Sequence, residues 1–124
     1  MQFKEIGNPT YIALETFRKS GEGVVTPVWV VAEGGKLYVW TVGDSGKVKR
    51  IRNQAEVKVV PCGPGGRPHG PQLEAQASLL DDPAQAEQIE VKLRKKYGLQ
   101  KKLVDFVLRV GGKTERAYLR LVLS

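Results

Sequence analysis

The chain has 124 residues, of which 41% are hydrophobic and 27% are charged, and its formal net charge is +7. This length predicts a single domain over residues 1–124, and no apolar run approaches the roughly 20 residues of a membrane span. One cysteine and one histidine exclude an internal disulfide and a Cys/His metal cluster. The first residues lack the apolar segment of a signal peptide, so we expect a cytoplasmic protein.

Alternating and β-branched runs predict six strands along the chain. They cover residues 11–18, 24–32, 36–42, 56–61, 72–80 and 115–123. Pro27 interrupts the second run, and because proline cannot donate to a strand ladder, we expect an edge, a bulge or a bend there. The segment 33–36 predicts a hairpin turn, and the glycine- and proline-rich segment 62–71 predicts a loop.

Three helices are predicted between the strands. The first covers residues 46–54, with Val48, Ile51 and Ala55 on its inward side. The second begins with Asp82 as N-cap and Pro83 at the first position, and it ends at Gly98, while the third spans residues 99–109. Six antiparallel strands with few helices favour a small β-barrel.

The end of the third strand and the start of the first helix have the composition of an anion site. Small turn residues lead into a helix whose first N–H groups and positive dipole end point the same way. Lys47 lies in the first turn, and Arg50 lies one turn later on the same face. We therefore expect a phosphate here to contact Thr41, Ser45, Lys47 and Arg50. The alternatives are a solvated basic helix face and a serine that only caps the helix.

Three motifs follow one another in residues 24–62. They are Thr26-Pro-Val-Trp29, then Leu37-Tyr-Val-Trp-Thr41 with Ser45-Gly-Lys47, and finally the helix-to-strand segment from Lys47 to Val57. In this order they resemble the pyridoxamine 5′-phosphate oxidase-like superfamily of split-barrel flavin and deazaflavin proteins. Later segments, at residues 66–71, 74–77 and 95–98, are similar to its deazaflavin-dependent branch. The resemblance covers about residues 10–123.

The resemblance implies a mainly β fold, a six-stranded antiparallel split β-barrel of the FMN-binding type. It also implies a homodimer with two cofactor sites in grooves at the dimer interface. The phosphate would lie by the residues named above and the ring along residues 26–29. The implied cofactor-binding residues are Thr26, Pro27, Val28, Trp29, Thr41, Ser45, Gly46, Lys47 and Arg50.

By the same resemblance, the cofactor is coenzyme F-420 (a deazaflavin) or FMN, and the reaction is hydride transfer to or from a small molecule. No side chain stands out as a catalytic acid or base, so we assign no catalytic residue. Pyridoxamine phosphate oxidases themselves carry an arginine where Gly46 stands, and they also have a second-strand arginine and a C-terminal Arg/His segment that this chain lacks. Vitamin B6 oxidation is therefore disfavoured.

Two other functions stay open. One is a non-catalytic flavin- or tetrapyrrole-binding protein. The other is a basic nucleic-acid-binding barrel. It is disfavoured because such barrels use exposed aromatic residues, whereas the aromatic residues here lie in strands that are predicted to be buried.

Several individual residues also have a structural interpretation that involves no ligand. Trp29 and Trp40 could be core or dimer-interface aromatics. Cys62 is expected as a buried small hydrophobe and His69 as a loop residue. The basic residues at 92–102 are expected to form a solvated helix face, or else to contact the acidic tail of a deazaflavin.

Overall fold

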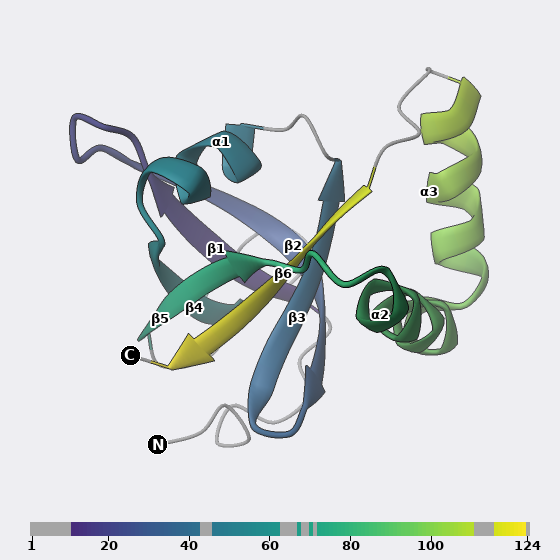
Figure 1. Ribbon diagram of the computed structural model, residues 1–124. Helices are drawn as coiled ribbons and strands as arrows, with labels where there is room; N and C mark the ends of the chain where they lie inside the picture. Colours follow the sequence, from purple (N-terminus) through teal and green to yellow (C-terminus); the bar gives the residue numbers. More distant parts are fainter. Residues whose placement is uncertain are drawn as a thin grey trace.

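The computed structural model describes residues 11–42, 46–62, 67, 70, 72–110 and 116–123. Six strands and three helices follow one another in these residues (Figure 1). They are β1 (Tyr11–Phe17), β2 (Gly23–Glu33), β3 (Lys36–Val42), α1 (Gly46–Asn53), β4 (Glu56–Cys62), β5 (Leu73–Leu79), α2 (Pro83–Tyr97), α3 (Leu99–Val110) and β6 (Arg116–Leu123).

The six strands form one closed barrel. Their order around it is β1-β2-β3-β6-β5-β4, and every neighbouring pair is antiparallel. Alternate side chains point inward and fill the barrel, as the period of a strand requires. These core residues are Ile12, Leu14, Val28, Val30, Leu37, Val39, Ile51, Val57, Val59, Ala75, Ala77, Leu119 and Leu121. The predicted mainly β, six-stranded antiparallel barrel is confirmed.

Strand β2 changes its partner along its length. Residues 23–29 pair with β1, whereas residues 30–33 pair with β3. Strand β3 in turn pairs with β2 only as far as Val39, and its last residues pair with β6. The two strands therefore diverge, and Pro27 lies in the diverging part, opposite Ala13 of β1. Pro27 therefore pairs with β1 but not with β3, and the local divergence of β2 from β3 agrees with the edge, bulge or bend predicted at this proline.

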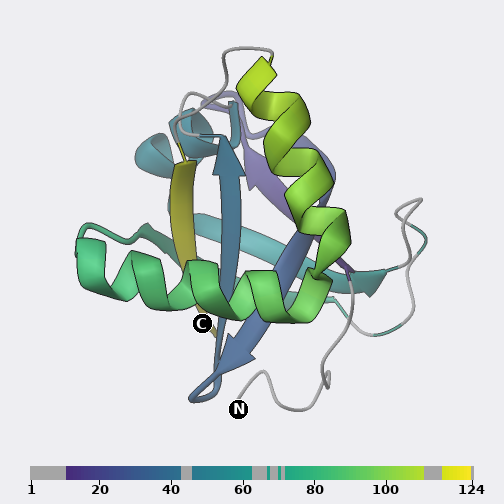
Figure 2. The same ribbon diagram turned by 90° about the vertical axis from the view of Figure 1, so that its right-hand side faces the viewer.

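The helices cover one end and one side of the barrel. α1 lies over one end and inserts Val48 and Ile51 (Figure 1). α2 crosses the outside of the barrel (Figure 2) and packs Ile89 and Leu93 against outward-facing residues of β2 and β3. α3 follows α2 through Gly98, whose φ of 54° favours glycine, and rises beside the barrel. No helix in the described ranges is long and apolar enough to cross a membrane.

One predicted inward residue is wrong. Ala55 is exposed, because α1 ends at Asn53 and residue 55 no longer follows the helical period.

Candidate functional site

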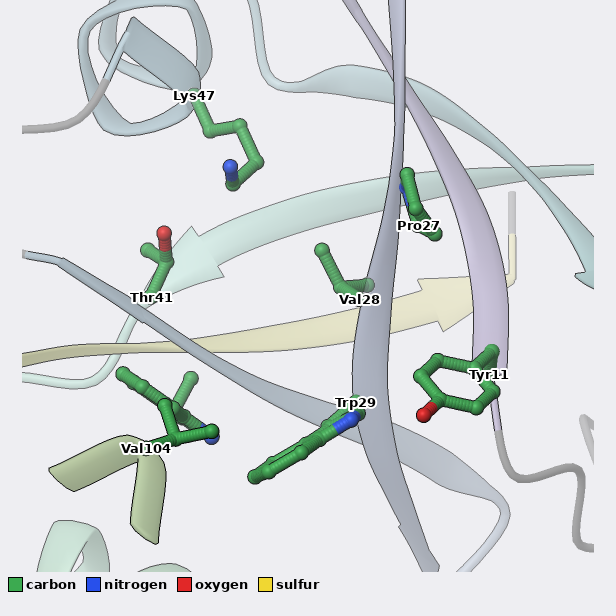
Figure 3. A pocket seen from close by; sticks show the side chains of 8 residues that line it. Tyr11, Pro27, Val28, Trp29, Thr41, Lys47 and Val104 are labelled. Atoms are coloured by element: carbon green, nitrogen blue, oxygen red, sulfur yellow. The ribbon is translucent and has the colours of Figure 1, made fainter. Parts of the chain in front are cut away.

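A pocket of about 310 Å³ lies where β2 and β3 diverge (Figure 3). Its walls come from both strands, from the start of β1, and from one residue each of α1 and α3. The lining residues are Tyr11, Pro27, Val28, Trp29, Trp40, Thr41, Lys47 and Val104. Most of them are apolar or aromatic, so the pocket is a mainly apolar slot with one cation. Such a composition is typical of sites for small molecules and cofactors.

Lys47 is that cation. Its side chain reaches from the first turn of α1 into the space between Thr41 and Val28 (Figure 3). Burial lowers its pKa, and the positive charge of Arg50 lowers it further. Among the described residues, no carboxylate lies within ion-pair distance of Lys47. A half-buried ammonium without a counter-charge is costly, and an anion in the pocket would remove that cost.

Thr26 adds an unsatisfied polar group beside the pocket. It precedes Pro27 on β2, and its Oγ1 atom is buried without a hydrogen-bond partner in the described part of the chain. Buried hydroxyl groups normally form a hydrogen bond, so a buried hydroxyl without a partner requires an explanation. A ligand carrying anionic oxygens could pair with the Lys47 ammonium in the pocket. The residues present therefore fit a phosphorylated cofactor.

Arg50 holds α1 in place from the side. Its Nε donates to Thr16 Oγ1 at 2.6 Å, which ties the helix to β1. Its guanidinium also packs against Gly46, where an added Cβ would lie 2.7 Å from Nη1. Glycine at position 46 therefore leaves room for this arginine.

The aromatic wall is held from behind by α2. The ring of Tyr97 stacks on Trp29 with centroids 4.4 Å apart and planes 9° apart. The Tyr97 hydroxyl accepts from the Val30 amide at 2.8 Å and donates to the Val30 carbonyl at 3.0 Å. Burial raises the pKa of Tyr97 to about 12, so it remains a neutral donor. Trp29 meets Trp40 edge to face, with centroids 6.2 Å apart. Tyr97 thus fixes both β2 and the indole that lines the pocket.

The structure brings together part of the predicted residue set. Pro27, Val28, Trp29, Thr41 and Lys47 line the pocket. Thr26, Gly46 and Arg50 are described but do not line it. Ser45 and His69 fall outside the described residues.

Three lining residues were not predicted as site residues. Tyr11 pairs directly with Trp29, so a correct strand register would have indicated it. Trp40 was considered only as a packing residue. Val104 gave no signal, because only the tertiary placement of α3 brings it to the pocket.

The basic segment 92–102 is more than a solvated face. Lys96 Nζ donates to the Val30 carbonyl at 2.6 Å, and burial lowers its pKa. Lys101 is fully buried, at 0% exposure, so the expectation of a solvated face is wrong for this residue. Lys101 Nζ instead lies 3.0 Å from Glu90 Oε1, which supplies the counter-charge that a buried ammonium needs. Cys62 is buried at the end of β4, as expected, and burial raises the pKa of its thiol.

Comparison with known proteins gives matches among solved structures. No protein-family model matches the sequence, and no curated protein is significantly similar to it. A candidate pyridoxamine 5′-phosphate oxidase from Listeria innocua is 16% identical with a TM-score of 0.67, over 93% of this chain and 84% of that one. An F420 reductase is 19% identical with a TM-score of 0.60, over 94% and 88% of the two chains. The heme storage protein HutZ of Vibrio cholerae is 12% identical with a TM-score of 0.71, over 100% and 92%. These similarities show a shared fold, and they confirm the fold that the sequence motifs predicted.

Proposed function

We propose that this chain, which has the split-barrel fold of the pyridoxamine 5′-phosphate oxidase-like superfamily, binds coenzyme F-420 or FMN and acts as an oxidoreductase on a small molecule. The observation that carries the proposal is Lys47, a half-buried cation at one end of an apolar, aromatic slot. A cofactor with a flat ring and a phosphate matches both parts of that slot. The phosphate would meet Lys47, and the ring would lie along Pro27, Val28 and Trp29.

Each residue of the site has a role in holding such a molecule. Lys47 would supply the charge-assisted contact, and the hydroxyl groups of Thr26 and Thr41 would donate hydrogen bonds to phosphate or ring oxygens. Arg50 would add positive charge from one turn further along α1, with Ser45 and Gly46 at the start of that helix. The bound cofactor would supply the hydride chemistry, while the protein orients it and excludes water.

A second groove favours coenzyme F-420 over FMN. It has a volume of about 570 Å³ and is lined by Val31, Ala32, Lys92, Lys95 and Lys96. Its first lining residue, Val31, stands two residues after Trp29 on β2, so the groove and the pocket use the same strand. Lys92 already pairs with Glu33 at 2.9 Å, which leaves Lys95 as the exposed cation. A basic groove suits the acidic tail of a deazaflavin coenzyme, which FMN does not carry.

A non-catalytic tetrapyrrole- or flavin-binding role is the second candidate. The similarity to a heme storage protein favours it, because that protein shares the fold over the whole of this chain. An open slot walled by two tryptophans could accept a large flat ring of either kind.

We also propose that the protein works as a homodimer in the cytoplasm. Leu103, Phe106 and Val110 of α3 are exposed at 63%, 63% and 74%, and they lie on the helix that borders the pocket. Exposed apolar side chains of this size are typical of interaction surfaces. Sedimentation equilibrium across a range of concentrations would test this, and a monomer at every concentration would contradict it.

Side-by-side titration with coenzyme F-420, FMN and heme tests the proposed function. The chain has two tryptophans, and both line the pocket, so their fluorescence should fall as a ligand binds. Saturable quenching by a phosphorylated flavin-type cofactor, together with oxidation of the bound cofactor by an acceptor when it is supplied in reduced form, supports the oxidoreductase. Saturable binding of heme alone supports the second candidate. Binding of none of the three refutes the cofactor proposal, and a salt-sensitive complex with an oligonucleotide would then favour the basic surface.

A further inference from the structure

Helix α3 borders the pocket through a small number of described side chains. Val104 lines the pocket, and Lys101, three residues earlier on the same face, is completely buried. Leu103 and Phe106, by contrast, are largely exposed. The described contacts of α3 with the barrel are therefore concentrated around Lys101 and Val104.

Lys101 is buried between a carboxylate and a tryptophan ring. Its Nζ lies 3.0 Å from Glu90 Oε1 and 4.5 Å from the centroid of the Trp40 ring. Glu90 belongs to α2, and its side chain is only 9% exposed. Burial raises the pKa of Tyr118, and the negative charge of Glu90 and a hydrogen bond to it raise this pKa further. The pair thus joins α3 to α2 directly behind one wall of the pocket.

Burying this ion pair is an unusual solution for packing two helices. Two well-packed apolar side chains would often serve stability as well or better, because the charges must be removed from water. The pair instead opposes movements that separate Lys101 from Glu90 while both stay buried, because separating two buried opposite charges costs free energy unless water reaches them. α2 itself is anchored to β2 by the Tyr97 hydroxyl and by Lys96. Gly98, with its positive φ, stands between the anchored helix and α3.

We infer that Glu90 and Lys101 form a latch that holds α3, and with it Val104, against the pocket and so limits entry to it. This inference rests on the proposed function only in taking the pocket as a ligand site. Glu90 and Lys101 are positioning residues, because they act through Trp40 and Val104. Separation of the pair lets α3 turn about Gly98, and this movement exposes the pocket face of both tryptophans.

Acrylamide quenching of tryptophan fluorescence tests the latch without any cofactor. Both tryptophans of the chain line the pocket, so the quenching constant reports access to it. We expect Lys101→Met to raise this constant by about two-fold or more, because the buried Glu90 then keeps only its longer contact with Arg94, whose Nε lies 3.9 Å from Oε2. Lys102→Met is the matched control, since Lys102 is the exposed neighbour on the same helix and should give the parental value. Glu90→Gln removes the same pair with a smaller change in shape, and it should raise the constant as well.

The double variant Glu90→Gln with Lys101→Met decides whether the two residues act together. Removing both charges leaves no unpaired charge, so its quenching constant should be lower than the product of the two single effects. Circular dichroism should show the barrel folded in every variant. Single variants that quench like the parent, or effects that simply multiply, would overturn the latch. Failure of the parent to bind any cofactor would refute the proposed function alone, because the quenching comparison does not depend on it.

Discussion

Replacing Lys47 with methionine should weaken the binding of a phosphorylated flavin without weakening the binding of its ring. The side chain reaches into the pocket and has no carboxylate partner among the described residues, so a bound phosphate would be its counter-charge. A hydrogen bond to a charged group is worth about 1.5–3 kcal/mol. Because Lys47 is only half buried, we take about 2 kcal/mol, which corresponds to roughly a 30-fold increase in Kd.

The assay is a thermodynamic cycle with FMN and riboflavin, which share one ring and differ in the phosphate. The Kd of each ligand is measured by fluorescence titration for the parent and for Lys47→Met. The change should appear with FMN and be nearly absent with riboflavin. Lys49→Met serves as the control, because Lys49 is exposed on the same helix and changes the net charge equally. Equal losses for both ligands, or an equal loss in the control, would refute a phosphate contact at Lys47.

Three further outcomes follow from other parts of the structure. Tyr97→Phe should lower the free energy of unfolding by about 1–3 kcal/mol in urea denaturation, because the buried Val30 amide loses its acceptor; unchanged stability would contradict the role of that hydroxyl. The Cys62 thiol, buried and with a raised pKa, should react with a thiol reagent only after unfolding, and reaction of the folded protein would show an accessible cysteine. Because burial lowers the pKa of Lys47 from its ordinary value of 10.5, the folded chain binds fewer protons than the unfolded chain between the two values. The ligand-free parent should therefore gain stability relative to Lys47→Met as the pH rises toward 10.5, and a constant difference in urea denaturation would contradict this.

Much of the fold could be predicted because the local signals agree with one another. Alternating residues predicted a strand over 11–18, and β1 there buries Ile12, Leu14 and Thr16, which are two residues apart. Asp82 accepts a hydrogen bond from the Ala84 amide at 3.0 Å, as its predicted N-cap position requires. Gly98 ends α2 with a positive φ. Such signals act within a few residues, so they can be read without knowing the fold.

The pocket could be predicted only in part. The first turn of α1 indicated Lys47, and the motif on β2 indicated Pro27, Val28 and Trp29, all of which line the pocket. Spacing along a helix also grouped Arg50 with Lys47, but the Arg50 side chain is bonded to Thr16 on β1. A shared helix face does not determine which neighbour a long side chain contacts, because that neighbour comes from another strand.

The sequence by itself determined the strands, the helices and the position of a cation at the start of α1, because periodicity, caps and turn residues act locally. Only the tertiary structure decided that β2 leaves β3 beside Pro27, that Tyr97 stacks on Trp29, and that Lys101 is buried against Glu90. These contacts join residues far apart in the chain. They depend on strand register and helix placement, which are set by the burial of the whole barrel and its helices.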